Sequence, residues 1–135
     1  MGLLIDSDVL ILADRQRTRL DFTPWQQYGS AFISAVTASE LLVGVLRAQT
    51  EAQRARRTAY VEGILAALPA LPFDLETARI HARMLADLPK NETVGAHDLL
   101  IAATALRHGF PVLTNNGKDF RRLAGVTVLD FLNPQ

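Results

Sequence analysis

Four carboxylates in this sequence lie beside predicted strand ends or at the start of a predicted helix. They are Asp6, Glu40, Asp98 and Asp119. In an open parallel sheet, ligands bind outside the carboxyl ends of the strands, where strand-to-helix connections meet. Asp6 directly follows the first predicted strand, whereas Asp98 reaches this edge only if its helix points its N-terminus there. Four carboxylates at one edge would form an oxygen-lined pocket suited to a hard divalent cation, Mg²⁺ or Mn²⁺.

Such a cluster is electrostatically costly unless it holds a counter-charge. Two carboxylates about 5 Å apart repel by roughly 3 kcal/mol at an effective dielectric of about 20, so gathered acids should bind cations or become protonated. Each acid also has a local explanation. Asp6 can cap the first helix, and Glu40 can complete a capping box with Thr37. Asp98 can favour the positive end of its helix dipole, and Asp119 can cap the helix after it. Only the joint arrangement favours a metal site.

Short apolar runs alternate with helical periodicity along the chain. Strands are predicted at residues 3–5, 32–36, 69–73, 111–114 and 126–129. Helices are predicted at residues 9–13, 37–47, 51–68, 76–88, 97–107 and 119–123, with Ser7 as the cap of the first. The strands lack a clean in/out alternation, which is typical of a parallel sheet buried on both faces. The sequence therefore predicts one α/β domain over residues 1–135, a central parallel sheet flanked by helices on both faces.

The composition excludes several classes of protein. The 135 residues include no cysteine, which excludes a disulfide framework, thiolate metal sites and a cysteine nucleophile. Hydrophobic residues make up 49% and charged residues 21%, which is typical of a globular chain. With three histidines, a metal site should be built mostly from oxygens. The N-terminus has no basic region, and no apolar run approaches the roughly 20 residues that span a bilayer. We expect a cytoplasmic protein without a membrane partner.

The charges balance, with 14 Lys and Arg against 14 Asp and Glu. A net charge of zero disfavours unselective binding to nucleic acid. With four acids pooled in one pocket, however, the remainder of the chain carries +4. Lys118, Arg121 and Arg122 flank Asp119, and these basic residues rank first as phosphate contacts. For the arginines within residues 15–19, a surface loop and a phosphate contact both stay open. Those within residues 54–57 are expected on a solvated helix face.

Four stretches together resemble the PIN-domain ribonucleases, in particular the VapC-type toxins of bacterial and archaeal toxin–antitoxin pairs. They are residues 4–10 (LIDSDVL), 33–41 (ISAVTASEL), 95–105 (GAHDLLIAATA) and 114–120 (TNNGKDF). They occur in the order and spacing of the family and run over almost the whole chain. Any one of them would be a weak signal, whereas four in order are a strong one.

The resemblance implies a Mg²⁺-dependent endoribonuclease. Its catalytic and metal-binding acids would be Asp6, Glu40, Asp98 and Asp119. The ion would activate a water molecule for attack on the RNA phosphodiester, and an acid that does not hold the ion would accept the proton of that water. The products expected from the family carry 5′-phosphate and 3′-hydroxyl ends.

The resemblance also places hydroxyl and amide side chains near the substrate. Ser7 matches a small hydroxyl position, and Thr114 matches the hydroxyl at a strand end. Asn116 stands where many relatives carry Asp, which removes one anionic ligand and leaves the number of metal ions open. The predicted substrate-binding residues are therefore Ser7, Thr114, Asn116, Lys118 and Arg121.

The family further implies protein partners. VapC-type toxins are usually homodimers, and a VapB-type antitoxin neutralises them by laying its tail across the acidic site. A basic side chain of that tail would substitute for the charge of the cation. We expect the same two partners for this chain.

Two other functions stay open from the residues alone. Asp6 and Asp8 form an Asp-x-Asp pair after a strand, which suits a phosphotransfer enzyme of the haloacid-dehalogenase type with an aspartyl nucleophile. That class expects a hydroxyl residue where Leu10 stands, and a later catalytic lysine. The second alternative is a catalytically silent PIN-like module that binds RNA or an antitoxin. A missing acid would favour it, and all four acids are present.

Overall fold

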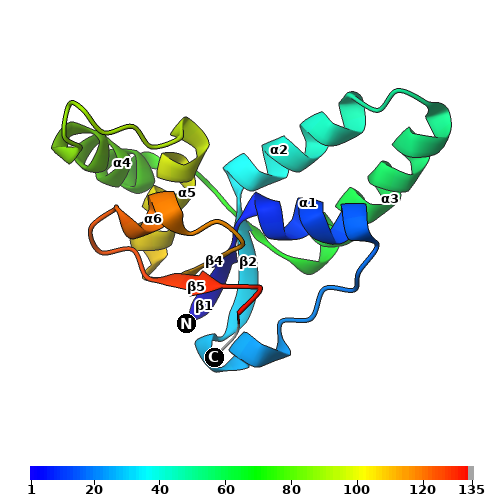
Figure 1. The fold of residues 1–135 in the computed structure, drawn as a ribbon, viewed down its shortest axis with the longest axis horizontal. Helices are drawn as coiled ribbons and strands as arrows, with labels where there is room; N and C mark the ends of the chain where they lie inside the picture. The colour runs from blue at the N-terminus through cyan, green and yellow to red at the C-terminus, as the bar shows by residue number, and fades with distance from the viewer. Residues whose placement is uncertain (134–135) are drawn as a thin grey trace.

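Five parallel strands form a central sheet in the computed structural model, which describes residues 1–133 (Figure 1). They are β1 (Gly2–Ile5), β2 (Ser30–Ser34), β3 (Ala70–Leu71), β4 (Val112–Thr114) and β5 (Val128–Asp130). The strand order is β3-β2-β1-β4-β5, and every neighbouring pair is parallel. The predicted parallel sheet is confirmed. The last two residues of the predicted domain, 134 and 135, lie outside the described residues.

Helices follow the strands in the predicted alternation. They are α1 (Ser7–Gln16), α2 (Ala35–Leu46), α3 (Glu51–Ala67), α4 (Leu75–Asp87), α5 (Ala96–His108) and α6 (Lys118–Arg121). A short 3₁₀ helix, η1 (Thr23–Tyr28), precedes β2 and was not predicted. In Figure 1, α2 and α3 extend to one side of the strand ends, and α4, α5 and α6 lie on the other.

The sheet separates two hydrophobic clusters. Leu3 and Ile5 of β1 belong to one cluster, together with residues of α1 and α3. Leu4 belongs to the other cluster, together with residues of α5 and α6. Because successive side chains of a strand point to opposite faces, this division shows that β1 is buried on both sides. The prediction of helices on both faces is confirmed, and all three side chains are at most 1% exposed.

The structure corrects the predicted start of the first helix. Asp6, not Ser7, is the N-cap of α1, and its Oδ1 accepts a 2.9 Å hydrogen bond from the Ser7 N–H. The backbone of Asp6 is extended, with φ −70° and ψ 148°, so Asp6 ends the strand and caps the helix at once. Ser7 is the first residue of the helix, which frees its hydroxyl for other contacts.

The second helix also begins earlier than predicted. Its N-cap is Ser34, whose Oγ accepts a 3.0 Å hydrogen bond from the Thr37 N–H. The predicted capping box of Thr37 with Glu40 is therefore wrong, and the strand ends at Ser34 rather than at residue 36. The physical reason is that Ser34 has the extended backbone of a cap and lies where β2 ceases to pair with β3. Glu40 consequently lies in the second turn of α2, with no capping role.

Within residues 1–133, no helix combines the length and the apolar character needed to cross a bilayer.

Candidate active site

The carboxyl ends of β1 and β4 meet where the strand order reverses. From β1 the chain runs outward through β2 to β3, whereas β4 and β5 lie on the opposite side of β1. Ile5 and Leu113 are partners in the register of these two strands. Asp6 and Thr114 therefore leave the sheet side by side, at the position where open α/β sheets bind their ligands.

Asp6 and Thr114 are joined directly and are both buried. Thr114 Oγ1 donates a 2.8 Å hydrogen bond to Asp6 Oδ2. Asp6 is 4% exposed and Thr114 is fully buried. The Asn116 N–H in turn donates a 3.0 Å hydrogen bond to Thr114 Oγ1. Three residues that the sequence predicted for the site thus form one hydrogen-bonded group.

Asp8 belongs to the same group, and sequence reasoning did not assign it to the site. Both of its carboxylate oxygens lie 3.3 Å from Thr114 Oγ1, and the Asn115 N–H donates to Asp8 Oδ1 at 3.2 Å. The Asp-x-Asp spacing after the first strand was the available signal. From the sequence alone this spacing indicates only a cap or a phosphotransfer enzyme, because nothing local links Asp8 to the end of β4.

Glu40 approaches the acids from α2. Ser7 Oγ donates a 3.1 Å hydrogen bond to Glu40 Oε1. On its other side, Glu40 Oε2 lies 3.5 Å from His97 Nδ1 of α5. Glu40 therefore links the first turns of α1 and α5, and the start of α5 does point to the strand ends as the prediction required.

Asp98 lies in the first turn of α5, close to the other acids. Burial raises its pKa above the usual range, and the charges of Asp119, Glu40 and Asp8 raise it further, while His97 lowers it. Since salt screens charge interactions beyond about 10 Å, these contributions are consistent with carboxylates that lie near Asp98. The four predicted acids are brought to one surface.

The pKa of Asp6 shows the cost of this gathering. Burial and then the charge of Asp8 raise the Asp6 pKa from 3.8 to about 7. The hydrogen bond from Thr114 lowers it, and the charge of Asp98 raises it. Carboxylates that lack a counter-charge become protonated, as expected for a site that a cation would neutralise.

Asp119 forms an ion pair with an arginine. Its Oδ1 lies 3.3 Å from Arg122 Nη1, and its side chain is 35% exposed. Arg122 Nη1 also donates to the Thr93 backbone oxygen at 3.1 Å, and Arg122 Nη2 lies 3.4 Å from Glu92 Oε2. Arg122 therefore ties the loop before α5 to α6 rather than extending freely toward a substrate.

The other predicted phosphate contacts differ in position. Lys118 is exposed at the start of α6, next to Asp119. Arg121 instead forms a 2.7 Å ion pair with Asp130 of β5. This partner gives Arg121 a structural role at the edge of the sheet, and the structure does not bring its guanidinium group to the acids.

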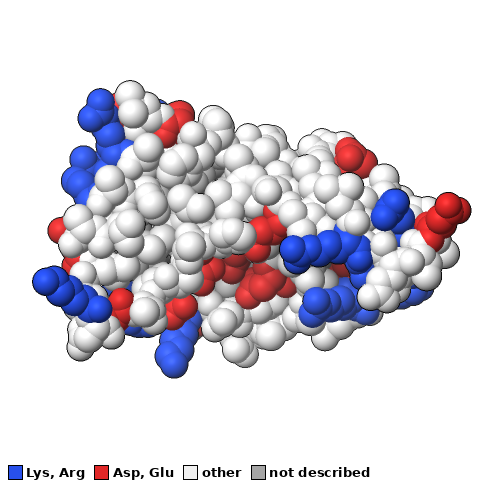
Figure 2. Space-filling view, turned by 90° about the horizontal axis from the view of Figure 1, so that it is seen from above, with Lys and Arg blue, Asp and Glu red and all other residues white. Residues whose placement is uncertain are grey.

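The donor set fits a hard divalent cation by its chemistry, since it consists of carboxylate oxygens. In the part of the chain that the structure describes, no three His, Cys, Asp or Glu side chains converge closely enough to enclose one ion. Figure 2 shows a central patch of Asp and Glu side chains on one face of the molecule, with Lys and Arg side chains on both sides of it.

Comparisons with known proteins agree with this geometry. The family model described as "PIN domain" matches residues 3–126. The chain is 42% identical to Ribonuclease VapC1 of Rickettsia felis over 130 residues, which cover 96% of each chain. It is 34% identical over 100 residues to the tRNA(fMet)-specific endonuclease VapC of Salmonella typhimurium, with 73% of this chain and 74% of that protein covered.

Solved structures extend the likeness to the fold. DNA-bound VapBC from Salmonella typhimurium matches with a TM-score of 0.82 and 26% identity, covering 96% of this chain and 98% of that one. VapBC2 from Rickettsia felis, bound to a DNA fragment from its promoter, matches with a TM-score of 0.85 and 19% identity. That match covers 97% of this chain and 99% of the other and shows the shared fold.

Proposed function

The chain belongs to the PIN-domain family and, within it, to the VapC ribonucleases, and on this premise we propose that it cleaves RNA by Mg²⁺-assisted hydrolysis at the acids around Asp6. The observation that carries the proposal is the buried Asp6 carboxylate at the junction of β1 and β4. Burial and the neighbouring acids raise its pKa to about 7, and a divalent cation bound there would neutralise the negative charge of these acids.

The side chains around Asp6 would have different roles in the reaction. Asp6 and Asp98 would hold the cation, with Asp8, Glu40 or Asp119 as further oxygen donors. When bound, the ion supplies charge neutralisation at the scissile phosphate and activation of a water molecule. The hydrogen bond from Thr114 favours the charged form of Asp6, and the Ser7 hydroxyl donates to Glu40 and orients it. An acid that does not hold the ion accepts the proton of the attacking water, and the products carry 5′-phosphate and 3′-hydroxyl ends.

We also propose an antitoxin partner. Two of the similar solved structures are named VapBC, and the name of the one from Mycobacterium tuberculosis describes the VapBC family as toxin–antitoxin systems. A VapB-type antitoxin would neutralise this chain by placing a basic side chain among the acids, where it would replace the charge of the cation. We further propose that the toxin is a homodimer, which size-exclusion chromatography with light scattering measures directly.

Neither alternative function is favoured by the structure. A haloacid-dehalogenase-like enzyme would need a hydroxyl group where Leu10 stands, and Leu10 is fully buried in the core. A catalytically silent binding module would be favoured by a missing acid, whereas the four predicted acids and Asp8 share one surface.

Incubation with total RNA tests the proposed activity. The expected result is cleavage with Mg²⁺, no cleavage with EDTA, and at least a hundredfold loss of rate in Asp98→Asn, as mutations of catalytic groups typically cause. Glu62→Gln removes an exposed acid of α3 that is not among the charges acting on Asp6 or Asp98, so it is the matched control and should cleave like the wild type. Initiator tRNA belongs among the substrates, since a relative is named for it. Intact RNA together with hydrolysis of simple phosphomonoesters would overturn the proposal.

Growth after induced expression provides a second readout. Wild type should arrest growth, and Asp98→Asn should not. Equal arrest by both would show that toxicity does not depend on catalysis. Mapping the cleaved ends across the cellular RNA would then identify the target.

A further inference from the structure

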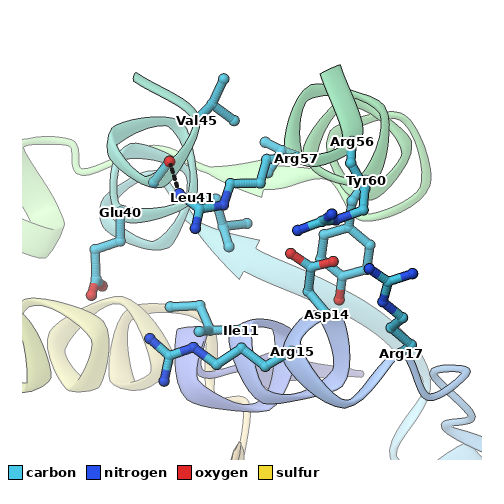
Figure 3. A pocket seen from close by; sticks show the side chains of 12 residues that line it. Ile11, Asp14, Arg15, Arg17, Glu40, Leu41, Val45, Arg56, Arg57 and Tyr60 are labelled. Carbon is cyan, nitrogen blue, oxygen red and sulfur yellow. Dashed lines mark hydrogen bonds between the residues drawn. The ribbon is translucent and has the colours of Figure 1, made fainter. Parts of the chain in front are cut away.

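A hollow lined by arginines opens beside the acids, between α1, α2 and α3 (Figure 3). Its volume is about 370 Å³, and ligand pockets generally span roughly 300–1,000 Å³. Four guanidinium groups line it: Arg15 and Arg17 come from the end of α1, and Arg56 and Arg57 come from α3. We call these four residues and the hollow between them the arginine pocket.

The arginine pocket carries excess positive charge. Its four arginines face two lining carboxylates, Asp14 and Glu40, which leaves a net charge of +2. Among residues 1–133, none of the four arginines forms an ion pair with a carboxylate. Arg57 Nη1 instead donates a 2.9 Å hydrogen bond to the Gly44 backbone oxygen, which fixes its orientation. Guanidinium groups without carboxylate partners are suited to phosphate, which they bind in a bidentate manner.

The backbone at Arg17 provides independent support. Arg17 is the C-cap of α1 and has φ 53°, and among the described residues it is the only non-glycine with positive φ. Glycine is the usual residue at a left-handed helix end because it avoids the steric cost of a Cβ atom. Here the chain places a long cationic side chain in that conformation, and the side chain lines the pocket. Strained residues of this kind concentrate at functional sites.

The arginine pocket is continuous with the acids through Glu40. Glu40 lines the pocket and also accepts the hydrogen bond from Ser7 beside Asp6. In Figure 3, Arg15 and Arg57 extend toward the Glu40 end of the pocket, whereas Arg17 and Arg56 lie at the Tyr60 end. A strand whose scissile phosphate lies at the acids would therefore carry its next phosphates into the pocket.

We propose that the arginine pocket binds the sugar–phosphate backbone of the RNA strand on one side of the cleaved bond, a role that rests on the proposed nuclease function. Charge complementarity and continuity with the acids favour RNA as the occupant. Because contacts to phosphate carry no base information, the arginine pocket positions the strand and leaves the choice of sequence to other contacts.

Binding to single-stranded RNA tests this proposal in a protein that cannot cut. The background is Asp98→Asn with EDTA, and the probe is a labelled oligouridine of about 12 nucleotides, within the usual span of single-strand sites. Arg15→Gln and Arg56→Gln each remove one charge from exposed pocket positions. For each variant we plot the logarithm of the association constant for the oligouridine against the logarithm of the salt concentration. The slope should become smaller in magnitude by about 0.7, the value for one lost phosphate contact on single strands. Arg54→Gln, on α3 but outside the pocket, should keep the parent slope.

The variant Arg17→Gly distinguishes an effect on RNA binding from an effect on the stability of the fold. Glycine relieves the left-handed strain, so the variant should melt at a higher temperature than its parent while binding the oligouridine more weakly. Weaker binding caused only by a damaged fold would instead come with a lower melting temperature, and that result would overturn the proposal. The same change in the active protein should raise KM for RNA and leave kcat nearly unchanged.

The remaining outcomes distinguish the two proposals. Unchanged slopes and KM values in the arginine variants, with RNA still cleaved, would overturn the role of the pocket and leave the nuclease function intact. The arginine variants could instead lose binding to labelled polyglutamate while their RNA binding stays unchanged. That result would show that the pocket binds an acidic protein segment, and it would equally overturn the proposal. Absence of RNA cleavage by the wild type would overturn the nuclease function and this inference with it.

Discussion

The hydroxyl of Thr114 donates a 2.8 Å hydrogen bond to the Asp6 carboxylate, although the two residues are 108 positions apart in the sequence. This bond joins the carboxyl ends of β4 and β1. It favours the charged form of Asp6, which burial and the neighbouring charges of Asp8 and Asp98 oppose. The competition between these effects determines whether the centre of the site is charged at neutral pH.

Removal of the Thr114 hydroxyl should therefore shift the titration of the site. Thr114→Val keeps the shape of the side chain but removes the donor to Asp6 Oδ2 and leaves only the Ser7 N–H on Oδ1, so the pKa of Asp6 should rise further. We expect the acid limb of the pH–activity profile to move to higher pH and the free energy of unfolding to fall by about 1–3 kcal/mol. Thr114→Ser keeps the donor and should behave like the wild type. If Thr114→Val and the wild type had the same pH–activity profile, Thr114 would not control the titration of Asp6.

The raised pKa of Asp6 predicts an unusual pH dependence of stability. With a folded-state pKa of about 7 against an ordinary value of 3.8, the folded chain binds more protons than the unfolded chain between these values. The free energy of unfolding should therefore fall as the pH rises through this window when EDTA removes divalent cations. Asp6→Asn cannot ionise and should lose this component, so it should gain stability relative to wild type at pH 8.

Urea unfolding at about pH 5 and pH 8 measures this difference, because the two values lie inside and above the window set by the shift. Glu62→Gln, the exposed-acid control, should follow the wild type at both pH values. An Asp6→Asn variant that is less stable than wild type at pH 8 would show that the Asp6 charge is not repelled in the folded state.

Mg²⁺ should stabilise the folded protein because it relieves repulsion among the acids. At a free concentration of 100 times Kd, a ligand that binds only the folded state contributes about 2.7 kcal/mol. Thermal melting should show this shift in the wild type and a smaller one in Asp98→Asn. NaCl at equal ionic strength controls for screening of the charges. Equal shifts with the two salts would exclude a specific cation site.

Arg122 should hold the loop before α5 against α6. Its guanidinium group contacts the Thr93 backbone oxygen and the Glu92 and Asp119 carboxylates. Since these contacts are partly exposed, Arg122→Ala should cost about 1 kcal/mol or less in global stability. Limited proteolysis within residues 88–95 should nevertheless become faster, because local opening no longer breaks these contacts. Arg122→Lys, which lacks the planar fork, should be intermediate, and equal cleavage rates for all three proteins would argue against this anchoring role.

Much of the fold was predictable because local apolar spacing determines where strands and helices form. The starts of helices were less predictable. Ser34 and Thr37 are both hydroxyl residues with capping potential, three positions apart, and the sequence favoured Thr37 because Glu40 completes a capping box. The structure selects Ser34 because pairing with β1 and β3 keeps the chain extended up to that residue.

In the candidate site, too, some features were predictable from the sequence and others were not. The sequence by itself determined that Asp6 ends a buried strand and that Thr114 ends another, since both follow short apolar runs. Only the tertiary structure placed these two ends side by side and added Asp8, which is locally indistinguishable from an ordinary acid in the first turn of a helix.

The arginine pocket depends most on the tertiary structure. Its arginines come from two segments: for the first, a surface loop and a phosphate contact both stay open from the sequence, and the second is expected on a solvated helix face. The segments approach one another because apolar residues such as Leu10 of α1 and Val61 of α3 are buried in the same core cluster. Apolar periodicity is visible in a sequence because it repeats within each helix. The neighbours of a charged side chain depend instead on how the helices pack, so the pairing of charges from distant segments becomes visible only in the folded chain.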